Sequence, residues 1–155
     1  MRLLLLATLS LAATADAQVR QGLFEVGGAA SLYSRDAGDD RVTVFTLAPE
    51  VGYLFTDQLE AGFALVYTKV EGFDGSGDLA LFAEYHFGAP GARTVPFLGL
   101  RVGTSITDDG DVLFGGNGGA KVFFLPGGAV TGELVVLTDG DDVDLGVQAG
   151  VAIFF

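Results

Sequence analysis

The fold is decided by the last eleven residues, Leu145-Gly146-Val147-Gln148-Ala149-Gly150-Val151-Ala152-Ile153-Phe154-Phe155. Every second residue from Leu145 to Phe155 is apolar, and the positions between them up to Ala152 are small or polar. A period of two is typical of a β-strand with two different faces. Such a strand belongs either to a soluble sheet with a buried terminus or to a transmembrane barrel whose apolar row faces lipid. The rest of the chain decides between these two.

The amino-terminal segment has the pattern of a secretory signal peptide. Met1-Arg2 is followed by an apolar run from Leu3 to Leu11, and Ala15-Asp16-Ala17 has the small-x-small form of a cleavage site. The run is too short to cross a bilayer as a helix. We therefore expect a signal peptide over residues 1–17 and one barrel domain over residues 18–155.

The composition combines high apolar content with a large negative charge. Mean hydropathy is +0.48 and half of the residues are apolar, yet the net charge is −12. The segment after residue 17 has no apolar run near the roughly 18 residues that a membrane helix needs. Because only helices and closed barrels satisfy every backbone group in lipid, the dispersed apolar residues favour a barrel. A pI near 4.1 argues against nucleic-acid binding, and the lack of cysteine excludes a disulfide scaffold.

The same alternation recurs along the chain. No segment has a sustained 3.6-residue period, and Pro49 indicates a bulge or an edge because proline removes a ladder donor. The pattern predicts an all-β, eight-stranded antiparallel up-and-down transmembrane β-barrel. Its expected strands are Gly22–Tyr33, Arg41–Tyr53, Leu59–Val70, Asp78–Phe87, Val95–Thr104, Val112–Leu125, Ala129–Thr138 and Val143–Phe155.

The expected connections are of two kinds. Alternate connections lie at the same end of an up-and-down barrel, so we expect one acidic outer rim and one periplasmic rim of short turns. Neither Asp108-Asp109-Gly110-Asp111 nor Asp139-Gly140-Asp141-Asp142 matches a full calcium-loop pattern. Divalent bridging to lipopolysaccharide phosphates is the more plausible role. The acidic set is Asp36, Asp39, Asp40, Glu71, Asp74, Asp108, Asp109, Asp111, Asp139, Asp141 and Asp142.

Three segments carry a resemblance to a known family. The stretch from Pro49 to Gly62, PEVGYLFTDQLEAG, resembles the strand-turn-strand hairpin of small outer-membrane barrels of the outer membrane protein A and X kind. The stretch from Pro96 to Leu100, PFLGL, and the terminal Phe155 are similar to other parts of that pattern. The chain departs from it in having no Trp for the interfacial girdles and in its short loops, which weaken an adhesin interpretation.

The resemblance implies a location and a route of assembly, but no single activity. It implies a bacterial outer-membrane barrel inserted by the barrel-assembly machinery, which would read Val151, Ile153 and Phe155 in the terminal strand. The expected partners are outer-membrane lipid and lipopolysaccharide. We expect a monomer in the cell outer membrane.

Charged residues gather on the expected inner face. In eight-stranded barrels the interior is just wide enough for side chains to fill. We predict a charged layer that plugs the periplasmic half of the lumen, with a proton or ion path as the alternative. Five acids exceed two permanent bases, so some carboxylate must be hydrated, protonated or paired with His86. The predicted layer is Glu25, Glu50, Glu60, Glu84, Arg101, Lys121 and Glu133.

The inward residues above this layer are unusually apolar for an aqueous lumen. They are Val42, Val44, Val66, Phe82, Val135 and Leu137. A packed core is the favoured interpretation. The alternative is a binding barrel, in the membrane or soluble and lipocalin-like, that holds an apolar ligand such as an acyl chain in its outward-opening half.

The sequence gives little support for catalysis. The one histidine, His86, is ten residues from Ser76 at the other end of its expected strand, roughly 30 Å away at the usual strand rise. No Ser–His pair can form on this topology. One histidine and no cysteine disfavour a zinc site, and the glycine-rich stretch from Gly115 to Lys121 lacks the phosphate-loop order. We expect no enzyme activity, no metal and no cofactor.

Overall fold

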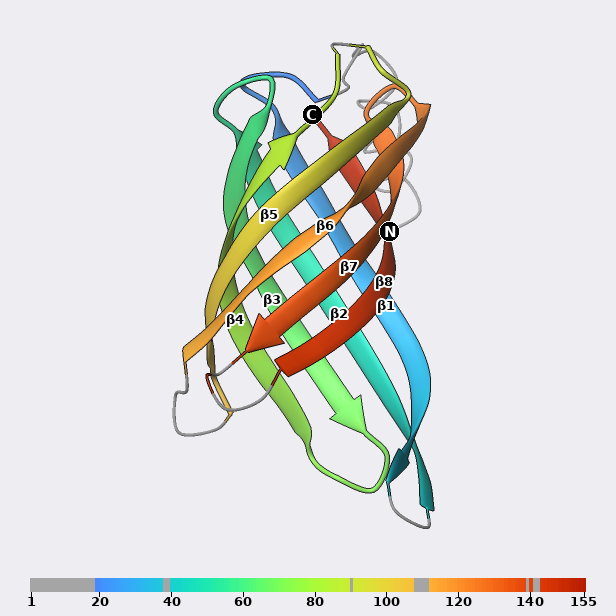
Figure 1. Ribbon diagram of the computed structural model, residues 1–155. Helices are drawn as coiled ribbons and strands as arrows, with labels where there is room; N and C mark the ends of the chain where they lie inside the picture. The colour runs from blue at the N-terminus through green and yellow to red at the C-terminus, as the bar shows by residue number, and fades with distance from the viewer. Residues whose placement is uncertain (1–18, 38–39, 90, 108–111, 139, 141–142) are drawn as a thin grey trace, which may run out of the picture.

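In the computed structural model the chain forms eight antiparallel strands that close into one barrel in chain order (Figure 1). The structure describes residues 19–37, 40–89, 91–107, 112–138, 140 and 143–155, without the side chains of 33–37, 40–42 and 144. The predicted eight-stranded barrel is confirmed, and the expected signal peptide lies outside the described residues. The strands are β1 Phe24–Ala37, β2 Asp40–Leu54, β3 Leu59–Val70, β4 Gly75–His86, β5 Thr94–Ser105, β6 Val112–Leu125, β7 Gly128–Thr138 and β8 Val143–Phe154.

In these described ranges no helix is long and apolar enough to cross a membrane.

Both ends of the described chain lie at one end of the barrel, which is the upper end in Figure 1 and is called here the terminal end. Phe24 and Phe155 exchange backbone hydrogen bonds of 2.9 and 3.0 Å, and Gly22 N donates to Leu54 O at 2.8 Å. The connections 55–58, 87–93 and 126–127 are at this end. The connections 38–39, 71–74, 106–111 and 139–142 are at the other end, called here the far end.

The connections at the far end have two, four, six and four residues, and the first two are shorter than the expected loops 34–40 and 71–77. The strands themselves extend into the expected loops, because backbone pairing continues from Ser34↔Thr43 to Ala37↔Asp40 and through Thr68↔Ser76. Pairing with a neighbour satisfies backbone groups that a loop would leave to water. Of the expected acidic rim, the side chains of Glu71 and Asp74 are described, and both are exposed.

Pro49 lies inside β2 without a bulge, so the expected irregularity takes another form. Its register is continuous with β1, where it faces Gly28. On the β3 side the pairing passes from Leu47↔Tyr67 to Glu50↔Ala64, and positions 48 and 49 have no partner between them. The missing proline N–H therefore interrupts one ladder without shifting it.

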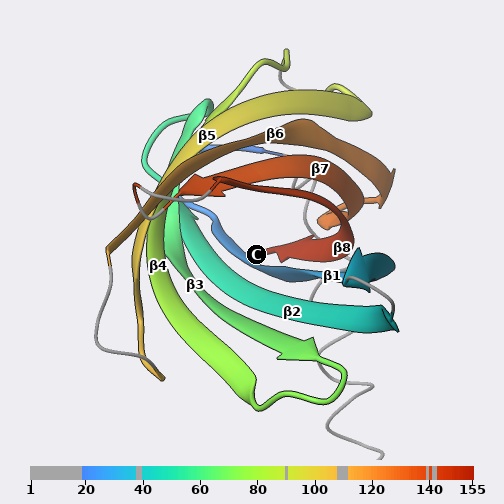
Figure 2. The same cartoon turned by 60° about the horizontal axis from the view of Figure 1, so that its bottom comes forward.

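The barrel closes through β1 and β8, as expected from the terminal strand. Their pairing runs from Glu25↔Phe154 to Ala30↔Ala149. This seam is shorter than the β1–β2 hairpin, in which every residue of β1 has a partner. Figure 2, which looks into the barrel from the far end, shows β8 beside β1 near the chain terminus.

Every strand exposes large apolar side chains on its outer face. Leu32, Leu100 and Leu145 are each more than 70% exposed, whereas a soluble barrel keeps its apolar row inside. Outward aromatic side chains gather at the terminal end. The ring centres of Phe24 and Phe155 are 6.3 Å apart, and those of Tyr53 and Phe55 are 5.0 Å apart. An apolar belt with an aromatic girdle is the surface that lipid requires.

Candidate functional site

The candidate site is a layer of charged side chains that crosses the lumen. The structure places each of the seven predicted residues on the inner face, and all are buried except Glu50, which is partly exposed. They come from seven of the eight strands, since alternation along each strand sends its glutamate, lysine or arginine inward. The contacts divide them into two groups, one around Lys121 and one around Arg101.

Lys121 on β6 is the cation of the group nearer the terminal end. Its side chain is 2% exposed. Nζ donates to Glu25 Oε2, lies 3.3 Å from Glu60 Oε2 and lies 3.4 Å from Glu84 Oε2. The rings of Phe97 and Phe154 are 5.3 and 5.5 Å from the same nitrogen. One ammonium group therefore faces three carboxylates and two aromatic rings at once.

Arg101 on β5 is the cation of the second group. Its Nη2 lies 3.4 Å from Glu50 Oε2, 3.4 Å from Glu133 Oε2 and 3.7 Å from Glu84 Oε1. The guanidinium carbon is 5.8 Å from the centre of the Phe82 ring. Glu84 contacts both cations and joins the two groups into one network.

Asn117 on β6 belongs to this network, although the sequence analysis did not include it. Its Nδ2 donates to Glu84 Oε1 at 2.7 Å and to Glu133 Oε2 at 2.8 Å. The signal was available, because Asn117 is four residues from Lys121 and so shares its face of the strand. A neutral amide here separates two carboxylates that would otherwise repel each other.

His86 ends β4 inside the barrel, with 1% of its side chain exposed. Its Nε2 lies 3.5 Å from Glu60 Oε2 and 3.8 Å from Glu84 Oε2. Ser76 is near the opposite end of the same strand, as the sequence analysis expected. The imidazole therefore faces carboxylates rather than a nucleophile.

An apolar floor lies between the charged layer and the terminal end. It includes side chains that the sequence analysis did not assign to the lumen, among them Leu54, Phe123 and Phe154, which are at most 3% exposed. Phe123 and Phe154 pack with ring centres 5.3 Å apart. The full buried cluster is Val19, Leu54, Val95, Phe123, Ala129, Ala152 and Phe154.

A small cavity lies on the far side of the charged layer. Its volume is about 30 Å³, and its lining includes Val66, Arg101, Val135 and Leu137. That space holds about two water molecules and is far smaller than the roughly 300 Å³ at which ligand pockets begin. Val44 and Phe82 are buried as expected, while the side chain of Val42 lies outside the described residues. This geometry favours a packed core over an acyl-chain pocket.

The three residues of the expected insertion signal point away from the lumen. Val151, Ile153 and Phe155 are 58%, 49% and 59% exposed on the outer face of the closing strand. Phe155 also lies in the aromatic girdle beside Phe24. These side chains are therefore accessible from the membrane side.

The network as a whole closes the lumen and leaves acids in excess. Five glutamates face Arg101 and Lys121, so three carboxylates have no permanent cation of their own. Among the described residues, Glu25 Oε1, Glu60 Oε1, both ring nitrogens of His86 and Arg101 Nε are buried without a hydrogen-bond partner. Such a network can exclude bulk water and hold a small cation or a proton.

Comparisons with known proteins bear on the fold. No protein-family model matches the sequence, and no curated protein matches it. The N-terminal β-barrel domain of OprF from Pseudomonas aeruginosa is similar in structure, with a TM-score of 0.68 and 17% identity over 87% of this chain and 98% of that one. Neisserial surface protein A (NspA) has a TM-score of 0.68 and 16% identity over 87% of this chain and 100% of that one.

A third solved structure, the outer membrane protein OprG from Pseudomonas aeruginosa, has a TM-score of 0.55 and 14% identity over 91% of this chain and 99% of that one. All three are nearly completely covered, so the match concerns the whole barrel rather than a hairpin. The resemblance stated from sequence is confirmed at the level of the fold. This chain has the fold of the small outer-membrane β-barrels.

Proposed function

We propose that the protein is a small outer-membrane barrel with a structural or interaction role, a closed lumen and no catalytic activity. The observation that carries this proposal is the continuous outward apolar surface of all eight strands, bordered by aromatic residues at the terminal end. An apolar surface that surrounds the whole barrel is stable in lipid, whereas soluble monomers rarely expose apolar patches beyond a few hundred Å².

The filled lumen supports a closed barrel rather than a pore. Lys121 and Arg101 hold the glutamates of five different strands across the centre. The apolar floor of Leu54, Phe123 and Phe154 adds a second barrier on the terminal side. Permeation of a hydrated ion would require both barriers to open.

The terminal strand supports assembly in the outer membrane. We propose that the barrel-assembly machinery binds the outward row of Val151, Ile153 and Phe155, and that lipid and lipopolysaccharide then surround the folded monomer. The row is exposed along β8 and its end is fixed to β1 by the two Phe24–Phe155 backbone hydrogen bonds. The terminal end would then face the periplasm.

Membrane fractionation combined with a gel-mobility assay tests the proposal. We expect the protein in the outer-membrane fraction, in a form that migrates differently before and after boiling because the closed barrel resists detergent. Protein recovered in the periplasm or the medium, with no change of mobility on heating, would contradict it. A strain with an impaired assembly machinery provides the control for insertion.

A further inference from the structure

We propose that Glu25, Glu60 and His86 form a binding site for a divalent first-row transition-metal ion of the zinc class. The site lies inside the barrel near the terminal end, and its ligands come from β1, β3 and β4. It goes beyond the structural role proposed above and does not depend on that role. The sequence alone disfavoured zinc because it offers one histidine and no cysteine, whereas the structure adds two carboxylates to that histidine.

The three side chains are close enough to share an ion after a small adjustment. One carboxylate oxygen of each glutamate and one ring nitrogen of His86 lie within 4.8 Å of one another. Ligand atoms about 2.1 Å from a common zinc ion are at most about 4 Å apart. Binding therefore needs the side chains to close in by about 1 Å, which a rotation of the flexible glutamates provides.

The ligand atoms are buried and lack hydrogen-bond partners. Glu25, Glu60 and His86 are each at most 1% exposed. Among the described residues, Glu25 Oε1, Glu60 Oε1 and both His86 nitrogens have no hydrogen-bond partner. A buried polar atom without a partner is costly, and a native protein usually provides one. All three side chains of the cluster carry such an atom.

Lys121 contacts one oxygen of each carboxylate. Its Nζ contacts Oε2 of Glu25 and Oε2 of Glu60, and Glu60 Oε2 also lies 3.5 Å from His86 Nε2. A metal ion bound here would therefore share Glu60 with the ammonium group. The network has three more carboxylates than permanent cations. A divalent ion would therefore reduce the buried negative charge.

The donor set selects the class of ion. An imidazole nitrogen with two carboxylates suits zinc and its neighbours in the first row. Calcium takes six to eight oxygen ligands, and magnesium requires near-ideal octahedral oxygen coordination. A site with two glutamates and a histidine satisfies neither. The rival occupant is a proton held between Glu25 and Glu60.

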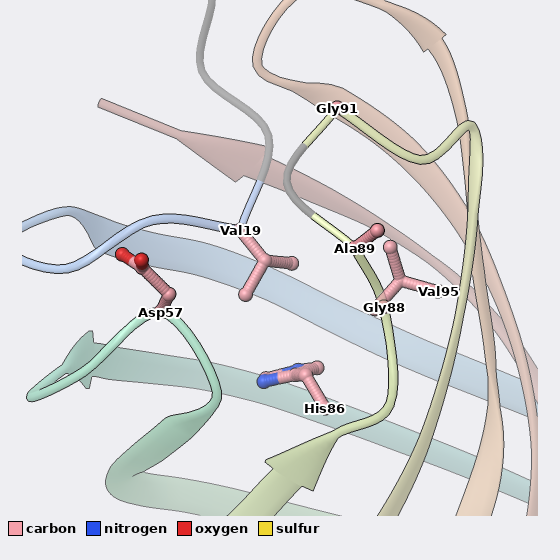
Figure 3. Close-up of a pocket in the computed structure, with 7 residues that line it drawn as sticks. All are labelled: Val19, Asp57, His86, Gly88, Ala89, Gly91 and Val95. Carbon is pink, nitrogen blue, oxygen red and sulfur yellow. The ribbon is translucent and has the colours of Figure 1, made fainter.

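His86 also borders a small hollow at the terminal end. This hollow of about 10 Å³ is lined by Val19, Asp57, His86, Gly88, Ala89, Gly91 and Val95. Figure 3 shows the ring of His86 facing the space between Val19 and the turn that carries Asp57. Asp57 is exposed, so a carboxylate lies at the edge of this hollow.

Zinc titration of the mature barrel, refolded in detergent micelles without a histidine tag, tests the proposal. Calorimetry should give one zinc ion per barrel. Because His86 is the one histidine of the chain, nitrogen-15 NMR of the imidazole reports the site directly, and zinc should shift its resonance. His86→Gln, Glu25→Gln and Glu60→Gln should each weaken binding by more than about 100-fold, since even second-shell changes cost 10- to 100-fold.

Glu71→Gln is the control, since Glu71 is an exposed glutamate outside the network and is not one of the three ligands. It should retain zinc binding. Each variant is first checked for the heat-dependent gel shift, and the imidazole resonance of the wild-type protein remains decisive if a variant does not fold. Absence of saturable binding, or binding that leaves the imidazole resonance unchanged, would overturn the proposal and leave a shared proton as the occupant.

Discussion

Replacing Lys121 by methionine tests the charged layer most severely. Methionine keeps a flexible apolar stem against Phe97 and Phe154 but removes the ammonium group that faces Glu25, Glu60 and Glu84. Glu84 retains Arg101 at 3.7 Å. Among the described residues, Lys121 is the one cation within ion-pair distance of Glu25. Removing one partner of a buried ion pair costs about 3–5 kcal/mol, so the free energy of unfolding should fall by that amount.

Equilibrium urea unfolding in lipid vesicles, followed by the gel shift between folded and unfolded forms, measures the change. Lys69→Met is the control, because Lys69 is exposed and its loss should change the unfolding free energy by less than about 0.5 kcal/mol. The double variant Lys121→Met/Glu25→Gln should recover part of the loss, since it removes an uncompensated acid with the base. A Lys121→Met barrel as stable as the wild type would refute the reasoning.

Three further predictions concern the outer surface, a close approach and the central amide. Leu100→Lys, in the middle of β5 on the exposed face, should destabilise the barrel in vesicles by about 2–4 kcal/mol, whereas Leu145→Lys near the far end of β8 should cost about 0–1 kcal/mol; equal urea midpoints for the two variants would contradict a lipid belt. Gly52→Ala should cost about 1–3 kcal/mol of unfolding free energy, because its Cβ would collide with the Glu60 carboxylate, while Gly132→Ala, which meets no atom within 4 Å, should be neutral; a Gly52→Ala barrel that unfolds at the wild-type urea concentration would show that Glu60 does not lie over this glycine. Asn117→Asp should lower the unfolding free energy by about 2 kcal/mol or more, because it replaces an amide donor to Glu84 and Glu133 by a third carboxylate; a variant as stable as the wild type would contradict this role of the amide.

The strand pattern could be predicted because side-chain direction depends on parity alone. The residues on either side of Glu25 and Glu84 in the sequence are mostly apolar and point to the opposite face of the strand. If that face contacts lipid, the glutamates must point into the barrel. Once one face is assigned to lipid, every residue of the strand is assigned. The barrel and the inward direction of the charged residues follow from this rule.

The contacts within the lumen could not be predicted, because they depend on the tilt and stagger that bring strands together. Glu25 and Lys121 are 96 positions apart in sequence yet share a hydrogen bond. The apolar floor of Phe123 and Phe154 follows the parity rule, but its depth relative to the charged layer depends on the register of β6, β7 and β8. Whether β2 tolerates Pro49 without a bulge depends on which neighbouring strand its missing N–H would face.

Solute permeability of lipid vesicles that contain the purified folded protein tests whether the inserted barrel has a closed lumen. A porin in a parallel sample provides the positive control. Vesicles that contain this protein should not swell in small sugars and should carry no steady ion conductance, because the network around Lys121 and Arg101 and the apolar floor both cross the lumen. Swelling, or a stable conductance proportional to the amount of folded barrel, would contradict a closed lumen.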